Sequence, residues 1–259
     1  MIDSEVKYHI NLSKNDIENA KYAIITGDPG RVGSIAKYLE KPKKIGQNRE
    51  YTSYLGNLSG EKVLIISTGM GGPSCAICVE ELASIGIEYI IRIGTSGGMQ
   101  LDVNAGDLVI PTGVIRQEGT SREYLPIEFP AVSDFNLNIC LKDACEELGY
   151  NYHTGVAHCK DSFYGQHNPN RMPVSYELEN KWQAWIKGGA LCSDMETASL
   201  FTVASTLKIH AAAILLVIWN QEREKRKLSQ DKVFDTEKAI KATVTAIKKL
   251  ILNNNNFKQ

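Results

Sequence analysis

Residues 22–40 read YAIITGDPGRVGSIAKYLE, and the rest of the chain repeats the pattern of this stretch. The apolar run Tyr22–Gly27 predicts a strand buried on both faces, because nearly every position is apolar instead of every second one. Residues 28–30 contain proline and glycine, which predict a tight turn. The amphipathic segment Arg31–Glu40 then predicts a helix. A buried strand that leads through a turn into a helix is typical of α/β proteins.

The same alternation continues to the C-terminus. Further strands are expected at Lys62–Thr68, Tyr89–Gly94, Asp107–Val114, Gly155–His158 and Ala213–Trp219. Further helices are expected at Ser74–Ile85, Phe135–Leu148, Tyr176–Lys187, Met195–Lys208 and Thr236–Ile251. We therefore expect a three-layer αβα fold with a largely parallel or mixed central sheet. No linker or repeat divides residues 1–259, which favours a single domain, and residues 253–259 are expected to form a frayed tail.

Composition excludes several classes of protein. The chain has 259 residues with 29 basic and 30 acidic side chains, a net charge of -1, which argues against a nucleic-acid or membrane-surface partner. Its longest apolar run, Ala211–Trp219, is far shorter than the ~20 residues of a membrane-spanning helix. Met1–Lys14 contains no apolar core for a signal peptide, and the six cysteines show no paired framework. We expect a cytoplasmic protein with reduced thiols.

Ligands of open α/β sheets bind beyond the carboxyl ends of the strands, where three polar or glycine-rich segments occur. The first is Gly27–Arg31. Glycine lets the backbone approach an anion closely, and Arg31 begins a helix whose N-terminus favours negative charge. The alternative is a simple turn with a surface arginine.

The second segment is Arg92–Gly98, in which an arginine lies inside an apolar strand. A buried charge is costly unless it is paired. A phosphate dianion would pair with Arg92, and Thr95 and the backbone amides beside the glycines would supply further donors. The alternative is a buried pair between Arg92 and a carboxylate.

The third segment is Ser193–Thr197, where Asp194 and Glu196 flank Met195 at the start of a predicted helix. A carboxylate can accept hydrogen bonds from two vicinal sugar hydroxyls while a thioether packs on the sugar ring. The alternative is that the carboxylates only cap the helix and interact with its dipole.

Other nucleotide and metal motifs are absent from the sequence. It contains no GxxxxGK[ST] loop and no GxGxxG, which argues against nucleoside triphosphates and dinucleotides. No HExxH motif or carboxylate–histidine cluster indicates a catalytic metal. An anion pocket combined with a sugar-binding acid, and no metal, indicates chemistry on a glycosyl group with phosphate as a reactant.

At these residues the chain resembles the nucleoside phosphorylases, and among them the members that cleave uridine. The matching stretches are Tyr8–Asp16, Gly27–Arg31, Asn48–Tyr51, Ser67–Ser74, Arg92–Gly98, Glu128–Val132, Asp161–Gln166 and Asp194–Glu196. They occur in one order from about His9 to Ile251, so the resemblance covers nearly the whole chain. It implies a nucleoside phosphorylase-like fold and the reversible phosphorolysis of uridine to uracil and ribose 1-phosphate in pyrimidine salvage, with deoxyuridine or thymidine as further substrates.

The resemblance also assigns roles to residues. It implies a phosphate site made of Gly27, Arg31, Arg92, Thr95 and, from a neighbouring subunit, Arg49. It implies a ribose site made of Thr95, Met195, Glu196 and, again from the neighbour, His9. Of these, Arg31, Arg92 and Glu196 would carry catalysis by orienting the phosphate and holding the sugar while an oxocarbenium-like transition state forms.

The base site follows from the same resemblance. Phe163 would pack near the base and sugar, and Gln166, with one acceptor and one donor, would match the edge of uracil. Related purine-cleaving enzymes carry an aspartate where this chain has Trp219–Gln221, so a pyrimidine is favoured over a purine.

The chain also departs from the pattern of the uridine-cleaving members. Asn168 stands where those members carry an arginine, and Lys160, His167 or Gln221 is expected to supply the missing donors. Asp194 replaces a glutamate, which leaves its role open.

The resemblance further implies partners and assembly. The substrates would be a nucleoside and inorganic phosphate, with no cofactor; a monovalent cation near Glu50 and Ser74 at a dimer contact is possible in such relatives. A dimer would be the minimal active unit and a hexamer the expected assembly. The alternatives are a purine nucleoside phosphorylase or nucleosidase of the same fold, and a nucleoside-binding or storage protein without catalysis.

Overall fold

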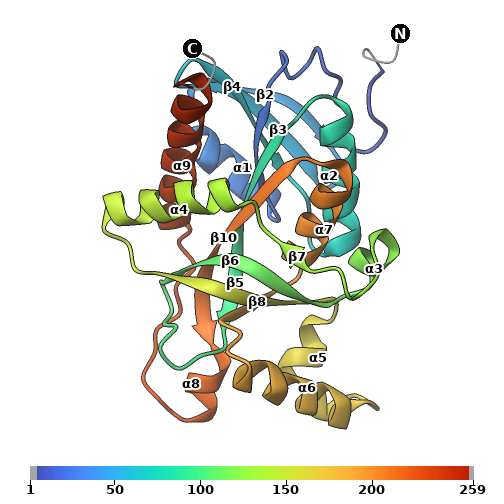
Figure 1. The fold of residues 1–259 in the computed structure, drawn as a ribbon, viewed down its shortest axis with the longest axis vertical. Coiled ribbons are helices and arrows are strands. Elements are labelled where there is room, and N and C mark those ends of the chain that lie inside the picture. Colours follow the sequence, from blue (N-terminus) through green and yellow to red (C-terminus); the bar gives the residue numbers. More distant parts are fainter. Residues whose placement is uncertain (1–4, 257–259) are drawn as a thin grey trace.

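A ten-stranded sheet runs through the centre of the protein between two layers of helices, in a computed structural model that describes residues 5–256 (Figure 1). The strands are β1 (Tyr22–Thr26), β2 (Glu40–Asn48), β3 (Tyr51–Leu58), β4 (Glu61–Ser67), β5 (Tyr89–Gly98), β6 (Leu108–Gln117), β7 (Ala131–Val132), β8 (Tyr152–Lys160), β9 (Cys192–Asp194) and β10 (His210–Asn220). The helices are α1 (Pro29–Ala36), α2 (Gly72–Ser84), α3 (Thr120–Tyr124), α4 (Phe135–Leu148), α5 (Phe163–His167), the 3₁₀ helix η1 (Pro169–Arg171), α6 (Ser175–Lys187), α7 (Thr197–Leu207), α8 (Gln221–Lys225) and α9 (Glu237–Asn256). All the strands and helices expected from the sequence are present, with differences at their ends.

The two faces of the sheet carry separate hydrophobic cores. Helices α1, α4 and α9 pack on one face and α2 and α7 on the other (Figure 1). Consecutive residues of β1 show why that strand is apolar throughout: Ile24 belongs to the first of these cores and Ile25 to the second. Side chains of a strand point alternately to opposite faces, so a strand covered by helices on both sides must be apolar at each position. The expected three-layer αβα architecture is confirmed.

The sheet is mixed, and one part of it closes on itself. The strand order is β10-β6-β8-β9-β5-β1-β4-β3-β2; β7 pairs with β6 beside this series, and β10 also pairs with β5. The strands β1, β5 and β10 run parallel, whereas β9 pairs antiparallel with β5 and β6 pairs antiparallel with β10. The strands β5, β10, β6, β8 and β9 therefore form a ring, and the end of β5 lies against β9.

The hairpin of β2 and β3 is not predicted from the sequence. The strand β2 reads EKPKKIGQN and lies at the edge of the sheet, where lysines and Pro42 block further pairing. Such a strand lacks the apolar pattern by which the buried strands are recognised. The hairpin turns at Arg49, which has a φ of 51°, in the left-handed region.

The last helix differs from expectation at its end. Helix α9 extends through Asn256, so residues 253–256 are helical where the sequence predicts a frayed tail. The Nδ2 atom of Asn254 donates to the hydroxyl of Tyr22 at 3.2 Å, which ties the final turn to β1. Residues 257–259 lie outside the described part of the chain. Among residues 5–256, no helix is both long enough and apolar enough to span a bilayer.

Candidate active site

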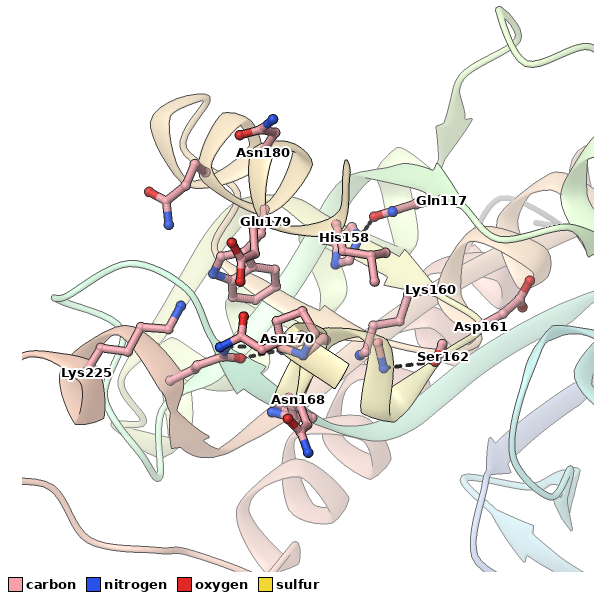
Figure 2. A pocket seen from close by; sticks show the side chains of 18 residues that line it. Gln117, His158, Lys160, Asp161, Ser162, Asn168, Asn170, Glu179, Asn180 and Lys225 are labelled. Carbon is pink, nitrogen blue, oxygen red and sulfur yellow. Dashed lines mark hydrogen bonds between the residues drawn. The ribbon is translucent and has the colours of Figure 1, made fainter. Parts of the chain in front are cut away.

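A cavity of about 580 Å³ opens between β8, the segment of α5 and η1, and α6 (Figure 2). Four of the five residues expected to bind a base line it: Lys160, Gln166, His167 and Gln221. The fifth, Phe163, lies outside this lining, is 51% exposed and packs against the ring of His167 with 4.3 Å between centroids. The structure thus brings most of the candidate base-binding residues together around one space.

Gln166 is held from two sides. Its Oε1 accepts from the hydroxyl of Ser193 at 2.8 Å, and its Nε2 donates to Oε1 of Gln221 at 3.1 Å. Gln221 also donates from Nε2 to the backbone carbonyl of Gln166 at 3.4 Å. The side chain that is expected to read the base is therefore already fixed by neighbours.

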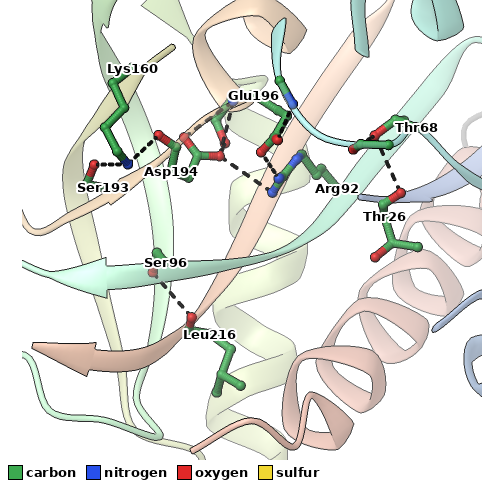
Figure 3. A network of polar contacts seen from close by, with 12 residues as sticks. Thr26, Thr68, Arg92, Ser96, Lys160, Ser193, Asp194, Glu196 and Leu216 are labelled. Atoms are coloured by element: carbon green, nitrogen blue, oxygen red, sulfur yellow. Dashed lines mark hydrogen bonds and ion pairs between the residues drawn. The ribbon is translucent and has the colours of Figure 1, made fainter. Parts of the chain in front are cut away.

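Lys160 connects this cavity to β9. Its buried ammonium donates to the hydroxyl of Ser193 at 2.9 Å and to the carbonyl of Asp194 at 3.2 Å (Figure 3). Burial lowers the pKa of Lys160, and the nearby Asp194 carboxylate opposes this effect. Burial and the charge of Lys160 together lower the pKa of His167 to about 4, so that this imidazole is neutral at physiological pH.

Arg92 lies beyond Asp194 and is 4% exposed at its side chain (Figure 3). Its Nη2 donates to Oε2 of Glu196, and its Nη1 lies 3.5 Å from Oδ2 of Asp194. Within the described residues, Nε and Nη1 of Arg92 have no hydrogen-bond partner. Burial lowers the pKa of Arg92, but Glu196 and Asp194 outweigh the burial and leave that pKa raised, so the group is a charged donor with unused hydrogens.

The glycine two residues after Arg92 makes room for this arrangement. A Cβ atom at Gly94 would lie 1.7 Å from Nη1 of Arg92 and 2.6 Å from Cδ2 of Leu215. Positions i and i+2 of a strand point to the same face, so the guanidinium folds over position 94. Only a residue without a side chain permits Arg92 to reach Glu196 in this way.

Glu196 is held from its other oxygen by the turn before α2. Its Oε1 accepts from the amide of Gly71 at 2.6 Å, and Gly71 has a φ of 93°, which favours glycine. Asp194 accepts from the amide of Thr197 at 3.2 Å and from its hydroxyl, at the start of α7. A buried arginine–carboxylate pair and a helix-capping carboxylate, the two structural alternatives considered for these segments, are thus both present.

Arg31 lies close enough to Arg92 for the two charges to interact. Its side chain is partly buried, and Nε is 3.7 Å from Oδ2 of Asp28, the residue that caps α1. Burial lowers the pKa of Arg31 most; Asp28 raises that pKa, and Arg92 lowers it further. Two guanidinium groups that oppose each other's charge would both be stabilised by an anion between them.

The remaining candidates in this region lie at strand ends. Thr95 is half-buried on β5, and Met195 is half-buried between Asp194 and Glu196. Gly27 follows β1, where an added Cβ would lie 3.1 Å from the carbonyl oxygen of Gly69. Here the turns after β1 and β4 approach closely.

His9 and Arg49 lie elsewhere in the chain. Nδ1 of His9 is 2.6 Å from Oε1 of Glu81 on α2, and the guanidinium of Arg49 lies 5.8 Å from the ring centroid of Tyr8. Among residues 5–256, neither side chain forms a hydrogen bond or ion pair with Arg92 or with any other candidate of the phosphate and ribose sites. Within one chain, His9 and Arg49 are therefore not connected to the candidate phosphate and ribose sites.

The departures from the family pattern also have defined positions. Arg171, the arginine nearest to the expected position, stacks over the ring of Tyr164 at 5.3 Å, while Asn168 lines the cavity. Asn220, which stands in the region of the purine-specific aspartate, is fully buried. It donates to the carbonyls of Gln100 and Val103 and caps α8.

Sequence reasoning assigned no functional role to His158, or to Ser193 at the start of the third segment. His158 is buried, with Nδ1 2.9 Å from the hydroxyl of Ser193 and Nε2 2.6 Å from Oε1 of Gln117. Because His158 and Lys160 are two residues apart on β8, their side chains share a face. That spacing is the one signal that could have linked His158 to the candidate base site.

Glu50 and Ser74, the residues of the expected cation position, contact each other. The hydroxyl of Ser74 donates to Oε1 of Glu50 at 2.6 Å, and this bond is the main cause of the lowered pKa of Glu50. In the described part of the chain, no three His, Cys, Asp or Glu side chains group as metal ligands.

Comparisons with known proteins place the chain in a family. The profile of the phosphorylase superfamily matches residues 21–252. The uridine phosphorylase of Treponema pallidum is 50% identical over 248 residues, 96% of this chain and 95% of that protein. The uridine phosphorylase of Escherichia coli is 36% identical, with 94% and 98% covered, and the guanosine phosphorylase of Halorubrum lacusprofundi is 34% identical, with 92% and 97% covered. Because both the profile and these relatives extend over nearly the whole chain, the protein belongs to the phosphorylase superfamily.

Proposed function

We propose that this protein catalyses the reversible phosphorolysis of uridine to uracil and ribose 1-phosphate, as a step of pyrimidine salvage. The observation that carries the proposal is the Arg92 guanidinium, which is buried, charged and equipped with two unused donor atoms beside Glu196 and Arg31. The names of the relatives from Treponema pallidum and Escherichia coli support uridine as the nucleoside.

Phosphate would bind between Arg31 and Arg92. Leaving a buried donor without a partner costs about 1–3 kcal/mol. Phosphate oxygens would supply acceptors to Nε and Nη1 of Arg92 and would also reduce the repulsion between the two guanidinium groups. Gly27 and Thr95 would contribute a close backbone approach and a hydroxyl at the same strand ends.

Glu196 would hold the ribose through its vicinal hydroxyls, with Met195 against the sugar ring. In this arrangement the phosphate faces the anomeric carbon, and its charge stabilises the oxocarbenium-like sugar as the bond to the base breaks. The phosphate oxygen forms the new bond to that carbon, and the departing uracil takes the electron pair of the broken one. Donors near the base then stabilise its negative charge.

Base recognition would rest on Gln166 and its surroundings. The expected donors Lys160, His167 and Gln221 line the same cavity. Asn220 binds two backbone carbonyls and caps a helix, and an amide has no acidic proton to give to a purine ring. These contacts favour a pyrimidine. Single alanine variants of Lys160 and His167 test the two donors, and unchanged kinetics with uridine in both variants would exclude them.

We also propose that the active form is an oligomer, with a dimer as the minimal unit and a hexamer as the assembly. His9 and Arg49, which lie apart from Arg92 within one chain, would complete the site of a neighbouring subunit. Mixed oligomers of His9→Ala and Arg92→Ala subunits test this. Activity above that of either variant alone would support shared sites, and an active monomer would exclude them.

A monovalent cation near Glu50 and Ser74 remains a proposal for the same dimer contact. Activity compared in potassium and in a bulky organic cation tests it. The cysteines support a cytoplasmic location, since all six are buried and unpaired, as expected in a reducing compartment.

The decisive experiment measures base release from uridine, with and without phosphate, beside inosine and guanosine. Phosphate-dependent release from uridine alone would support the proposal. Release without phosphate would indicate a nucleosidase, and purine release would place the chain with guanosine phosphorylases. Calorimetric binding of uridine without any product would indicate a nucleoside-binding protein.

A further inference from the structure

A continuous series of polar side chains leads from α6 to Gln166. The indole nitrogen Nε1 of Trp185 donates to Oε1 of Gln117 at 3.2 Å, and the same oxygen lies 2.6 Å from Nε2 of His158. Figure 2 shows Gln117 and His158 joined at the edge of the cavity. Nδ1 of His158 is 2.9 Å from the hydroxyl of Ser193, which contacts Gln166 at 2.8 Å.

The hydroxyl of Ser193 links the hydrogen-bonding states of His158 and Gln166. A hydroxyl has one proton to donate and two lone pairs to accept with, and that of Ser193 has three polar neighbours: Lys160, His158 and Gln166. The ammonium of Lys160 can only donate. Of His158 and Gln166, one must therefore donate to Ser193 while the other accepts from it. The tautomer of His158 and the orientation of the Gln166 carboxamide are linked.

The indole of Trp185 determines which ring nitrogen of His158 carries the proton. An indole N–H can only donate, so Gln117 directs its oxygen towards Trp185, and His158 faces that same oxygen with Nε2. Nε2 of His158 must then carry the proton. Burial and the charge of Lys160 lower the pKa of His158 to about 3, so the ring is neutral and its Nδ1 accepts from Ser193.

The Ser193 hydroxyl therefore donates its one hydrogen bond to Nδ1 of His158. The carboxamide of Gln166 must then donate a hydrogen bond from its nitrogen to the oxygen of Ser193. A 180° turn of the Gln166 and Gln221 carboxamides achieves this by exchanging their oxygen and nitrogen positions. The contact between the two side chains at 3.1 Å is kept with donor and acceptor reversed. Only the weak 3.4 Å contact of Gln221 with the carbonyl of Gln166 is lost.

We propose that this relay of Trp185, Gln117, His158 and Ser193 fixes the orientation of the Gln166 carboxamide and so determines which pyrimidine the enzyme accepts. The inference rests on the proposed function, in which Gln166 binds the base. Uracil presents N–H at N3 and a carbonyl at C4, whereas cytosine presents an acceptor at N3 and an amino group at C4. A carboxamide free to turn would match either edge; a fixed one matches only one.

The test compares kcat/KM for uridine with that for cytidine in the presence of phosphate. Ser193→Ala removes the junction of the relay, and Trp185→Phe removes its far end without touching Ser193 or Gln166. We expect the uridine-to-cytidine ratio to fall at least about fivefold in both, since a bidentate base contact is worth roughly 1–3 kcal/mol of discrimination. Ser193→Thr keeps the hydroxyl and should retain the ratio of the unmodified enzyme.

Ser162→Ala is the matched control. Ser162 lines the same cavity and caps α5, the helix that carries Gln166, but it lies outside the relay. Its loss should weaken both substrates equally and leave their ratio unchanged. Circular dichroism of each variant shows whether it has folded.

The tautomer itself gives an independent readout. In protein labelled with [¹⁵N]histidine, the shifts of His158 should show a protonated Nε2 and an unprotonated Nδ1. A protonated Nδ1, or an unchanged ratio in both relay variants of an enzyme that cleaves uridine, would overturn the inference. An unmodified enzyme that releases no uracil would instead refute the proposed function, and the ¹⁵N shifts would still test the relay.

Discussion

Replacing Gly94 by alanine tests whether the position of the Arg92 guanidinium decides the use of phosphate. The added Cβ would lie 1.7 Å from Nη1 and 2.8 Å from Cζ of Arg92, and 2.6 Å from Cδ2 of Leu215. Non-bonded heavy atoms prefer separations of about 3.5–4.0 Å, so Nη1 has to move by roughly 2 Å. Leu215 belongs to the core and limits how far the backbone can shift instead.

The expected effect is large because the displaced group orients a reactant. A misplacement of about 1 Å can cost about 10²-fold in rate. We therefore expect kcat/KM for phosphate to fall about 100-fold in Gly94→Ala, which corresponds to about 2.7 kcal/mol of transition-state stabilisation. Overpacking of this kind also lowers the free energy of unfolding by about 1–3 kcal/mol.

The assay is uracil release from uridine at varied phosphate concentration, with urea denaturation to establish folding. Gly33→Ala in α1 is the control, because a Cβ at Gly33 meets no atom within 4 Å. Its kinetics should be unchanged. If Gly94→Ala folds and keeps the kcat/KM for phosphate of the unmodified protein, Arg92 does not hold phosphate and the reasoning fails.

Three further variants test the roles of Arg31, Glu196 and His158. Arg31→Ala should raise the KM for phosphate by about tenfold or more with a smaller effect on uridine, and steady-state kinetics that show equal effects on both substrates would contradict a phosphate role. Glu196→Gln leaves Arg92 without its main counter-charge, so the free energy of unfolding in urea should fall by about 3 kcal/mol; an unchanged midpoint would mean that the pair contributes little. His158 has a folded pKa of about 3 against an ordinary 6.5, so its contribution to stability is complete above pH 6.5 and is lost as the pH falls towards 3. Between these values the free energy of unfolding should fall by up to about 1.4 kcal/mol per pH unit more than in His158→Gln, and parallel urea midpoints of the two proteins from pH 7 to pH 5 would refute this.

Much of the fold could be predicted from the sequence because the buried strands are apolar on both faces, as Ile24 and Ile25 illustrate. The strand β2 could not, since its lysines serve an exposed edge and carry no apolar period. Arg92 was recognisable as an unusual charge inside a strand. Which of its possible partners it takes depends on Glu196, a residue 104 positions away.

The base site shows the limit of sequence reasoning more sharply. Gln166 could be proposed from its motif, and Lys160 as one candidate donor in place of the missing arginine. Their connection through Ser193 and His158 arises only when β8 and β9 lie side by side. Three helices separate β8 from β9 in the chain, so no local sequence pattern predicts a contact between these strands. The tautomer of His158 depends in addition on all of the hydrogen-bond partners of its ring.

The burial of all six cysteines has a practical consequence for experiments on this protein. Burial raises the pKa of Cys75, Cys145 and Cys192 to about 12, so at neutral pH these sulfurs are protonated and shielded from reagents. An alkylating reagent therefore modifies them only after the chain has opened. The rate of thiol modification therefore measures how often the folded chain opens. A nucleoside or phosphate that binds the folded form lowers this rate, and the decrease is larger for a ligand that binds more tightly.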